Sequence, residues 1–425
     1  MAGVDAARLA RLQSLGVLSG VTAGAWLGAA EAPTKLVTLG IPPVAISLVM
    51  VLGVFLARWS LPALLRGTAG VRADLMRAPH LVVWALLAGG LWAIANTLTV
   101  YAIRDVGLAI AFPLWNANGL LGIVWGALLF GELRGAGPLR WLGVSGGAVV
   151  LFLGAVVLGL ASVEQVEPAA AARGIAAALG AGVLWGTMYI PYRKAYLTGM
   201  HPLSFLAFFT LGEVATMGTL AWTQLGGPAG VWQTLAAAKS VWFWLLLGGF
   251  VWVIGDLFQQ YAVKYVGIGR GIPLSNTNQL WGLLWGVFVF GELADAEGAV
   301  LVRVVGGSLG MAAGALAIAL SSAPLREHRH WQAAAEREAQ RYGLDPAWVQ
   351  ARLAGEDPDA STATRRSALD VLLVAGATAV FVWAATLAEA PALAFRSDAA
   401  LALAAASLAL LAWCALALWR TTRFG

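Results

Sequence analysis

Residues 89–133 read GGLWAIANTLTVYAIRDVGLAIAFPLWNANGLLGIVWGALLFGEL, and this stretch decides the fold because the chain repeats it 160 residues later. The copy, residues 249–293, reads GFVWVIGDLFQQYAVKYVGIGRGIPLSNTNQLWGLLWGVFVFGEL, and 19 of the 45 aligned positions are identical. A weaker match at a shift of 159 extends the similarity upstream. The chain therefore contains an internal duplication. The matched pairs used below are Trp92/Trp252, Asn96/Asp256, Asn116/Asn276, Asn118/Asn278, Trp26/Trp185 and Gly53/Gly212.

The composition excludes a water-soluble domain. The chain is 60% apolar and 12% charged over 425 residues, whereas soluble domains are about half apolar and about a quarter charged. The apolar runs are continuous rather than alternating, which predicts helices and not a membrane β-barrel. Because a helix needs about 20 apolar residues to cross the hydrocarbon core, we expect an all-α integral membrane protein. The expected spans lie near 12–32, 37–58, 81–103, 106–130, 139–161, 174–192, 202–223, 240–263, 266–290, 299–320, 368–388 and 398–419.

The repeat implies an inverted architecture. Each copy contains five expected spans, and because five is an odd number the second copy must enter the membrane from the opposite side. Inverted repeats are typical of carriers that bind their substrate near the midplane. We therefore expect a ten-helix bundle of two inverted five-helix repeats plus a C-terminal transmembrane hairpin. The boundaries are 1–161 for the first repeat, 174–320 for the second, 321–367 for a cytoplasmic loop, and 368–425 for the hairpin and tail.

The positive residues predict the orientation. Placing both termini inside puts 21 of the 27 Lys and Arg residues on the cytoplasmic side, as the positive-inside rule requires. Seven of these arginines lie in 321–367, which also contains an Ala/Glu/Arg/Gln-rich run expected to form short amphipathic helices. The net charge of +5 is thus explained by loops, and no motif for nucleic acid is present. We expect a multi-pass protein of the cell membrane.

Two stretches resemble a known superfamily. The first is Gly182-Val-Leu-Trp-Gly-Thr-Met-Tyr-Ile-Pro191 with Lys194, and the second combines Trp252-Val-Ile-Gly-Asp256, Pro273-Leu-Ser275 and Gly286-Val-Phe-Val-Phe-Gly-Glu292. Together they resemble the drug/metabolite transporter superfamily, and within it the glucose/ribose porter group of sugar uptake proteins. The resemblance covers roughly residues 12–320 and implies transport of a small polar solute, above all a sugar. The hairpin after residue 367 departs from the ten-helix pattern of that group.

Matched aromatic and polar residues form the first set of candidate substrate ligands. Asp256 follows Trp252 by four residues and Asn96 follows Trp92 by four, so each pair shares a helix face; Gln259 continues the face of Asp256. An indole can pack on the apolar face of a sugar ring while the polar group bonds its hydroxyls. The alternative is that Asn96 and Asp256 bond neighbouring helices.

Amide side chains near two prolines form the second set. Pro113 and Pro273 should kink their spans and free backbone acceptors there. Residues two apart on a helix point roughly 200° apart, so we expect one Asn of each pair to line the pathway and the other to join helices. Trp185 is expected to add a second aromatic wall with Trp26, unless both only pack. The amide candidates are Asn116, Asn118, Asn276, Asn278 and Gln279.

Two acids, Glu213 and Asp256, lie well inside expected spans, where ionisable groups are costly and indicate function. No basic residue is expected at the same depth, so the sequence predicts no lasting ion pair for Asp256. That leaves protonation or hydration, and Asp256 is the first candidate for coupling transport to protons, with Glu213 second. Glu132 and Glu292, at span ends, are interpreted as capping and salt-bridging groups.

The sequence offers no chemistry for an enzyme. It has one cysteine, Cys414, no phosphate-binding glycine loop and no set of metal ligands, so we expect no cofactor and either passive or ion-driven transport. The alternatives are an exporter of the same superfamily with a non-sugar substrate, and a membrane sensor that uses 321–367 as its output. The solute, the direction, the coupling ion and the oligomeric state, a homodimer among the options, stay open. Membrane lipid and the solute are the expected partners.

Overall fold

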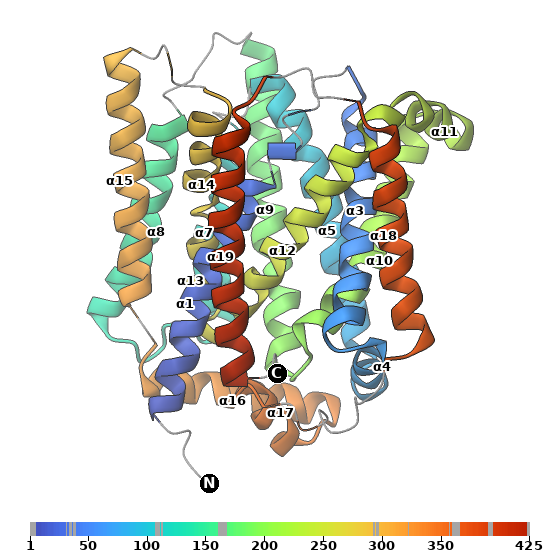
Figure 1. The fold of residues 1–425 in the computed structure, drawn as a ribbon. Helices are drawn as coiled ribbons and strands as arrows, with labels where there is room; N and C mark the ends of the chain where they lie inside the picture. The colour runs from blue at the N-terminus through green and yellow to red at the C-terminus, as the bar shows by residue number, and fades with distance from the viewer. Residues whose placement is uncertain are drawn as a thin grey trace.

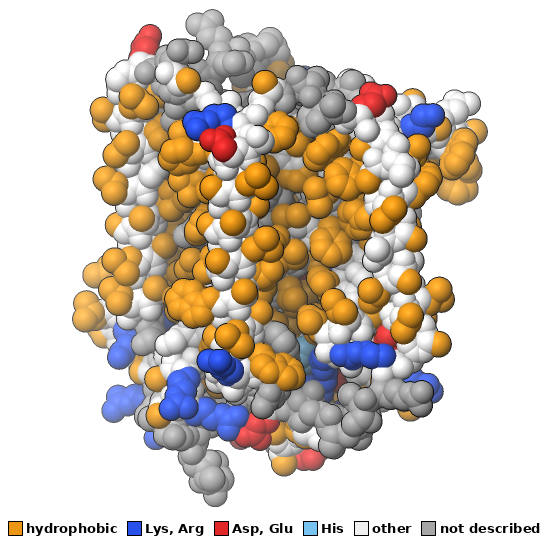
Figure 2. Space-filling model, in the orientation of Figure 1, with side chains coloured by type: hydrophobic (Ala, Val, Ile, Leu, Met, Phe, Trp, Pro, Cys, Tyr) orange, Lys and Arg blue, Asp and Glu red, His pale blue; other side chains and the backbone are white. Residues whose placement is uncertain are grey.

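The computed structural model describes residues 6–30, 32–33, 36, 40–106, 111, 114–159, 168–291, 294, 297–321, 323–356, 358, 366–389 and 394–422. Over these residues the protein is an all-helical bundle (Figure 1). Nine of the described helices are long and apolar enough to cross a membrane. Figure 2 shows an apolar band across the face in view, with most of the visible Lys and Arg side chains at the end where α16 and α17 lie. The nine are α3 (Pro43–Leu65), α5 (Leu81–Val106), α8 (Pro138–Gly159), α9 (Pro168–Leu197), α10 (Pro202–Gln224), α12 (Trp242–Val266), α15 (Gly298–Leu320), α18 (Ala368–Leu387) and α19 (Ser397–Thr422). The expected integral membrane helical bundle is confirmed.

Two of the expected spans are interrupted rather than continuous. In the second repeat the span near 266–290 is divided into α13 (Ile268–Ser275), α14 (Asn278–Leu284) and the π-helical turn η3 (Trp285–Val289). Pro273 lies inside α13, which ends at Ser275. Proline has no backbone N–H to donate to the carbonyl four residues earlier, that of Gly269, which weakens this short helix. In the first repeat α7 (Asn118–Leu129) corresponds to α14. Pro113 lies outside the described residues.

The long helices pack in reciprocal pairs. Helix α1 (Ala6–Ala29) packs on α12 as α9 packs on α5, and α3 packs on α12 as α10 packs on α5. In the repeat alignment α1, α3 and α5 correspond to α9, α10 and α12, so each of these contacts has a counterpart in the other copy. Helices α8 and α15, which correspond to each other, pack together at one side of the bundle (Figure 1).

Glycines allow these helices to approach closely. A Cβ at Gly53 of α3 would collide with the backbone of Leu246 in α12, and a Cβ at Gly212 of α10 would collide with the backbone of Leu86 in α5. Gly53 and Gly212 are aligned in the repeat, so both copies use the same contact. Small residues serve this purpose in membranes because lipid provides no hydrophobic drive between helices.

Shorter helices cover the two ends. Helices α4 (Thr68–Arg77), α16 (Leu325–Tyr342) and α17 (Pro346–Leu353) lie at the same end as both termini (Figure 1). Helix α11 (Gly227–Ala237) lies at the opposite end. The segment 321–367 thus contains helices, as expected, and its cytoplasmic location stays a prediction.

The added helices α18 and α19 attach to different parts of the bundle. Helix α18 packs on α3 and α12, and α19 packs on α1 and η3. The indole nitrogen of Trp26 donates to the carbonyl of Ser407 in α19, at 3.2 Å. This hydrogen bond joins the first helix of the chain to the added hairpin, and an aromatic wall of Trp26 with Trp185 stays a prediction.

We predict that Gly53→Val and Gly212→Val each destabilise the protein by at least about 1–3 kcal/mol, because the added side chain forces two backbones apart. The measurement is thermal unfolding of the purified protein in detergent. Gly306→Val is the matched control, since a Cβ there meets nothing within 4 Å. If all three variants and the parent had the same melting temperature, the close helix contacts would not contribute to stability.

Candidate transport site

The two matched tryptophans meet near the middle of the bundle. Trp92 of α5 and Trp252 of α12 lie with ring centroids 4.9 Å apart in an edge-to-face arrangement. Trp92 is 2% exposed. The indoles that the sequence proposed as a surface for a sugar ring therefore pack against each other.

Arg58 joins both buried acids, which corrects the sequence prediction. Its Nη1 lies 2.8 Å from Oε2 of Glu213, and its Nη2 lies 2.7 Å from Oδ2 of Asp256. All three side chains are 0% exposed. The expectation that no base reaches the depth of Asp256 was wrong because α3 continues to Leu65, which moves Arg58 from the end of a span to well inside it.

Aromatic and amide groups complete the environment of this ion cluster. The guanidinium carbon of Arg58 lies 4.1 Å from the ring centroid of Phe209 and 5.4 Å from that of Trp252. The other oxygen of Asp256, Oδ1, which Arg58 does not contact, accepts a hydrogen bond from Nε2 of Gln260 at 2.8 Å. The hydroxyl of Tyr196 donates in turn to Gln260. The cluster therefore links α3, α9, α10 and α12.

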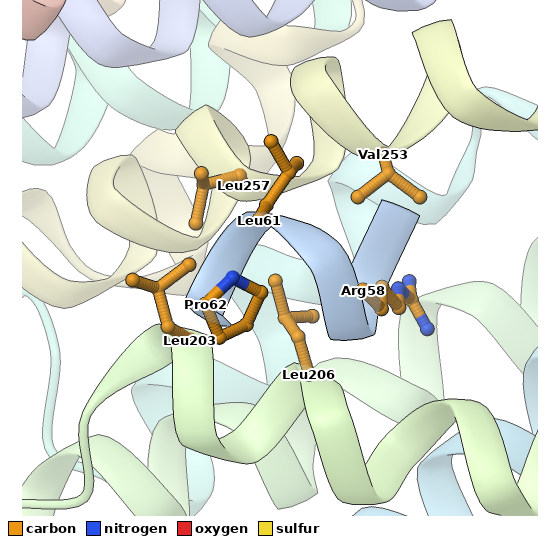
Figure 3. A pocket seen from close by; sticks show the side chains of 7 residues that line it. All are labelled: Arg58, Leu61, Pro62, Leu203, Leu206, Val253 and Leu257. Atoms are coloured by element: carbon orange, nitrogen blue, oxygen red, sulfur yellow. The ribbon is translucent and has the colours of Figure 1, made fainter. Parts of the chain in front are cut away.

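An apolar pocket lies beside the ion cluster but takes no part in it. Figure 3 shows the guanidinium of Arg58 pointing away from the other side chains that line this pocket. Those side chains carry no polar group suited to a solute, so we do not place the substrate there. They are Leu61, Pro62, Leu203, Leu206, Val253 and Leu257.

The amide candidates bond one another where the two interrupted spans meet. Nδ2 of Asn276 donates to the carbonyl of Asn116 and to Oδ1 of Asn118, both at 2.9 Å. Nδ2 of Asn116 lies 3.5 Å from Oε1 of Gln279, whose own Nε2 donates to the carbonyl of Ala155 at 3.2 Å. The amides thus join the two copies to each other.

The remaining candidates lie around this centre. Nδ2 of Asn96 donates to Ser47 of α3 at 3.2 Å, the helix-bonding alternative considered above. Nε2 of Gln259 donates to Ser275 at 2.6 Å. Trp185 packs edge-to-face on Trp115, with centroids 5.9 Å apart. Oδ1 of Asn278 is buried and accepts no hydrogen bond from the residues that the structure describes.

Glu132 acts as a cap and as an ion-pair partner, as the sequence predicted. Its carboxylate accepts from the backbone amides of Ile268 and Gly269 at 3.0 and 2.9 Å, at the start of α13. Nε of Arg193 lies 3.0 Å from Oε1. Burial raises the pKa of Glu132, and Arg193 and the two amides oppose that rise. Glu292 lies outside the described residues.

Helices α16 and α17 are held against one end of the bundle by ion pairs that the sequence analysis missed. Arg270 of α13 makes a two-pronged pair with Glu327 of α16, at 2.7 and 2.9 Å. Lys194 of α9 lies 3.2 Å from Glu338. Asp74 of α4 pairs with Arg352 of α17. The signal available in the sequence was the set of acids in a segment otherwise rich in arginine.

The described helices are those of a multi-pass membrane protein whose interior contains buried polar clusters. Residues 178–323 match the family model described as "Sugar transport protein". The glucose uptake protein GlcU of Staphylococcus xylosus is 22% identical over 218 residues, covering 51% of this chain and 70% of that protein. A putative sugar uptake protein of Lactiplantibacillus plantarum is 24% identical over 250 residues, covering 57% and 80%.

A shorter match of higher identity is to a putative sugar uptake protein of Streptococcus pyogenes serotype M1. It is 42% identical over 65 residues, or 15% of this chain and 23% of that protein. These findings confirm the resemblance to sugar porters. Over these segments the chain is similar in sequence to bacterial sugar uptake proteins.

We predict that Arg58→Met destabilises the protein by about 3–5 kcal/mol, because it leaves buried carboxylates without a counter-charge. The triple variant Arg58→Met, Glu213→Gln, Asp256→Asn should recover most of that loss, since no charge remains to be compensated. Thermal unfolding in detergent at neutral pH compares the two. A triple variant no more stable than Arg58→Met would mean that packing, and not charge, explains the role of Arg58.

Proposed function

We propose that the protein carries a sugar across the membrane by alternating access between two inverted halves, residues 1–161 and 174–320. The substrate class rests on the match of residues 178–323 to sugar transport proteins, and the mechanism rests on the reciprocal packing of repeat-related helices. Rocking of one half against the other would alternately expose a site between them.

The substrate would bind where the two halves meet. In the closed arrangement the amides there bond each other, and the two indoles pack together. When the halves part, sugar hydroxyls replace the amide partners, because a hydroxyl both donates and accepts. A sugar ring then takes the place of one indole against the other. The residues proposed to contact substrate are Trp92, Asn96, Asn116, Asn118, Trp185, Trp252, Asp256, Gln259, Asn276, Asn278 and Gln279.

The end covered by α16 and α17 is closed and would have to open for exchange on that side. We assign this end to the cytoplasm because most basic residues belong to it. Opening there requires the Arg270–Glu327 pair, whose side chains are 2% and 0% exposed, to separate or to move as a unit with α16.

Uptake by proteoliposomes tests the function. A panel of radiolabelled sugars and amino acids, with and without a pH gradient, is expected to show counterflow exchange of a sugar. Exchange of an amino acid with none of any sugar would overturn the proposal in favour of a metabolite carrier with another substrate.

We predict that Trp252→Ala and Asn276→Ala each weaken sugar binding by about 1 kcal/mol or more, roughly fivefold, through loss of a ring contact or a hydrogen bond. Equilibrium binding to purified protein measures this. Trp222→Ala is the control, because Trp222 is 59% exposed on the outer surface. Parental binding by both variants would place the sugar elsewhere.

We also predict that Glu327→Ala makes the covered end easier to open. In a Cys414→Ala background, a Ser275→Cys reporter, buried in α13, should react faster with a membrane-impermeant thiol reagent once Arg270 has lost its partner. Glu336→Ala, an exposed position on the same helix, should leave the rate unchanged. Equal rates in both variants would exclude the Arg270–Glu327 pair as a closure of this end.

A further inference from the structure

The buried ion cluster does not balance in charge. Arg58 supplies one positive charge and faces two acids, Glu213 and Asp256. The other titratable groups around the cluster are the hydroxyls of Tyr189, Tyr192 and Tyr196 on α9, which carry no charge at neutral pH. Among the described residues no second base pairs with either carboxylate. Lys264 is on α12 but eight residues beyond Asp256, about two helical turns away. With both acids ionised the cluster would bury one uncompensated negative charge, which a low-dielectric interior strongly disfavours.

The two carboxylates are not equivalent. Asp256 accepts a hydrogen bond at each oxygen, from Arg58 at 2.7 Å and from Gln260 at 2.8 Å. Glu213 is 2.8 Å from Nη1 of Arg58 and also faces the hydroxyl of Thr210 on its own helix. The contacts to its two oxygens lack the geometry of a hydrogen bond, unlike those of Asp256. Hydrogen bonding stabilises an ionised carboxylate. The proton that would neutralise the excess negative charge therefore belongs on Glu213 rather than on Asp256.

We propose that Glu213 holds the transported proton, and that Arg58 is the positioning residue that keeps Asp256 ionised. This deepens the proposed function and rests on it. One proton binds a Glu213 oxygen before the site closes, leaving a neutral acid beside an Arg58–Asp256 pair, and the same proton leaves when the site opens on the other side. The cluster takes one proton per cycle, and Glu213 replaces Asp256 as the first candidate.

Trp252 provides the link between the proton and the sugar. One contact of its ring is Trp92 in the proposed sugar site, and another is the guanidinium of Arg58. Movement of Trp252 on sugar binding therefore reaches Arg58 directly, and the distance from Arg58 to Glu213 sets how readily Glu213 gives up its proton. Binding of the sugar and binding of the proton can thus each favour the same closed arrangement.

Two variants separate the roles of the acids. In proteoliposomes Glu213→Gln should lose accumulation driven by a proton gradient while counterflow exchange persists, because the amide imitates the neutral acid. Glu213→Asp should restore accumulation with a shifted pH profile. In Asp256→Asn the charge of Arg58 is compensated by Glu213 alone, which stabilises the ionised form of Glu213. Protonation of Glu213, and with it gradient-driven uptake, should therefore need a lower pH than in the parent. Glu336→Gln is the control and should match the parent throughout.

Infrared spectroscopy of the purified protein gives a readout that does not depend on transport. The carbonyl-stretch band of a buried carboxylic acid is expected in the parent and in Asp256→Asn at low pH, and it should be absent from Glu213→Gln. Gradient-driven accumulation by Glu213→Gln, or survival of the band in that variant, overturns the assignment to Glu213.

The outcomes also distinguish this inference from the proposed function. A parent that exchanges sugar but ignores a pH gradient refutes proton coupling and leaves the sugar carrier intact. A parent that exchanges no sugar refutes the carrier, and the infrared band still decides whether Glu213 holds a proton.

Discussion

The centre of the molecule depends on one guanidinium shared between two carboxylates. Arg58, Glu213 and Asp256 come from α3, α10 and α12, and none is exposed. In a membrane protein such charges persist only when they are paired, since the cost of burying one alone reaches several kcal/mol. The cluster therefore fixes the relative depth of three helices, and any movement between them must keep the charge compensated or exchange a proton.

Around that centre the backbone is symmetric and the charges are not. The glycine contacts of Gly53 and Gly212 are copies of each other, whereas the repeat partner of Asp256 is the neutral Asn96, which bonds Ser47. At the shift of 159 Arg58 aligns with Met217 and Glu213 with Val54. The repeated helices thus share their close contacts, while the buried ion cluster belongs to one side of the repeat alone.

The end covered by α16 and α17 shows how the chain differs from a plain ten-helix bundle. These helices reach residues of both halves, since Glu327 pairs with Arg270 and also accepts from the backbone of Leu133. The buried, two-pronged pair of Arg270 with Glu327 makes α16 a structural part of the bundle and not a loose appendage.

The sequence by itself determined the helical membrane fold, the duplication and most span positions, because hydrophobic length and a 160-residue repeat are local or linear properties of the chain. It also identified Glu213, Asp256 and the amides near Pro273 as buried polar groups of interest. Which of them touch was decided only by the tertiary structure. The partner of Asp256 lies 198 residues away on α3, which continues past the expected end of its span, through Pro62, to Leu65. Pairing of charges depends on helix depth and rotation, and these are set by packing between helices distant in sequence.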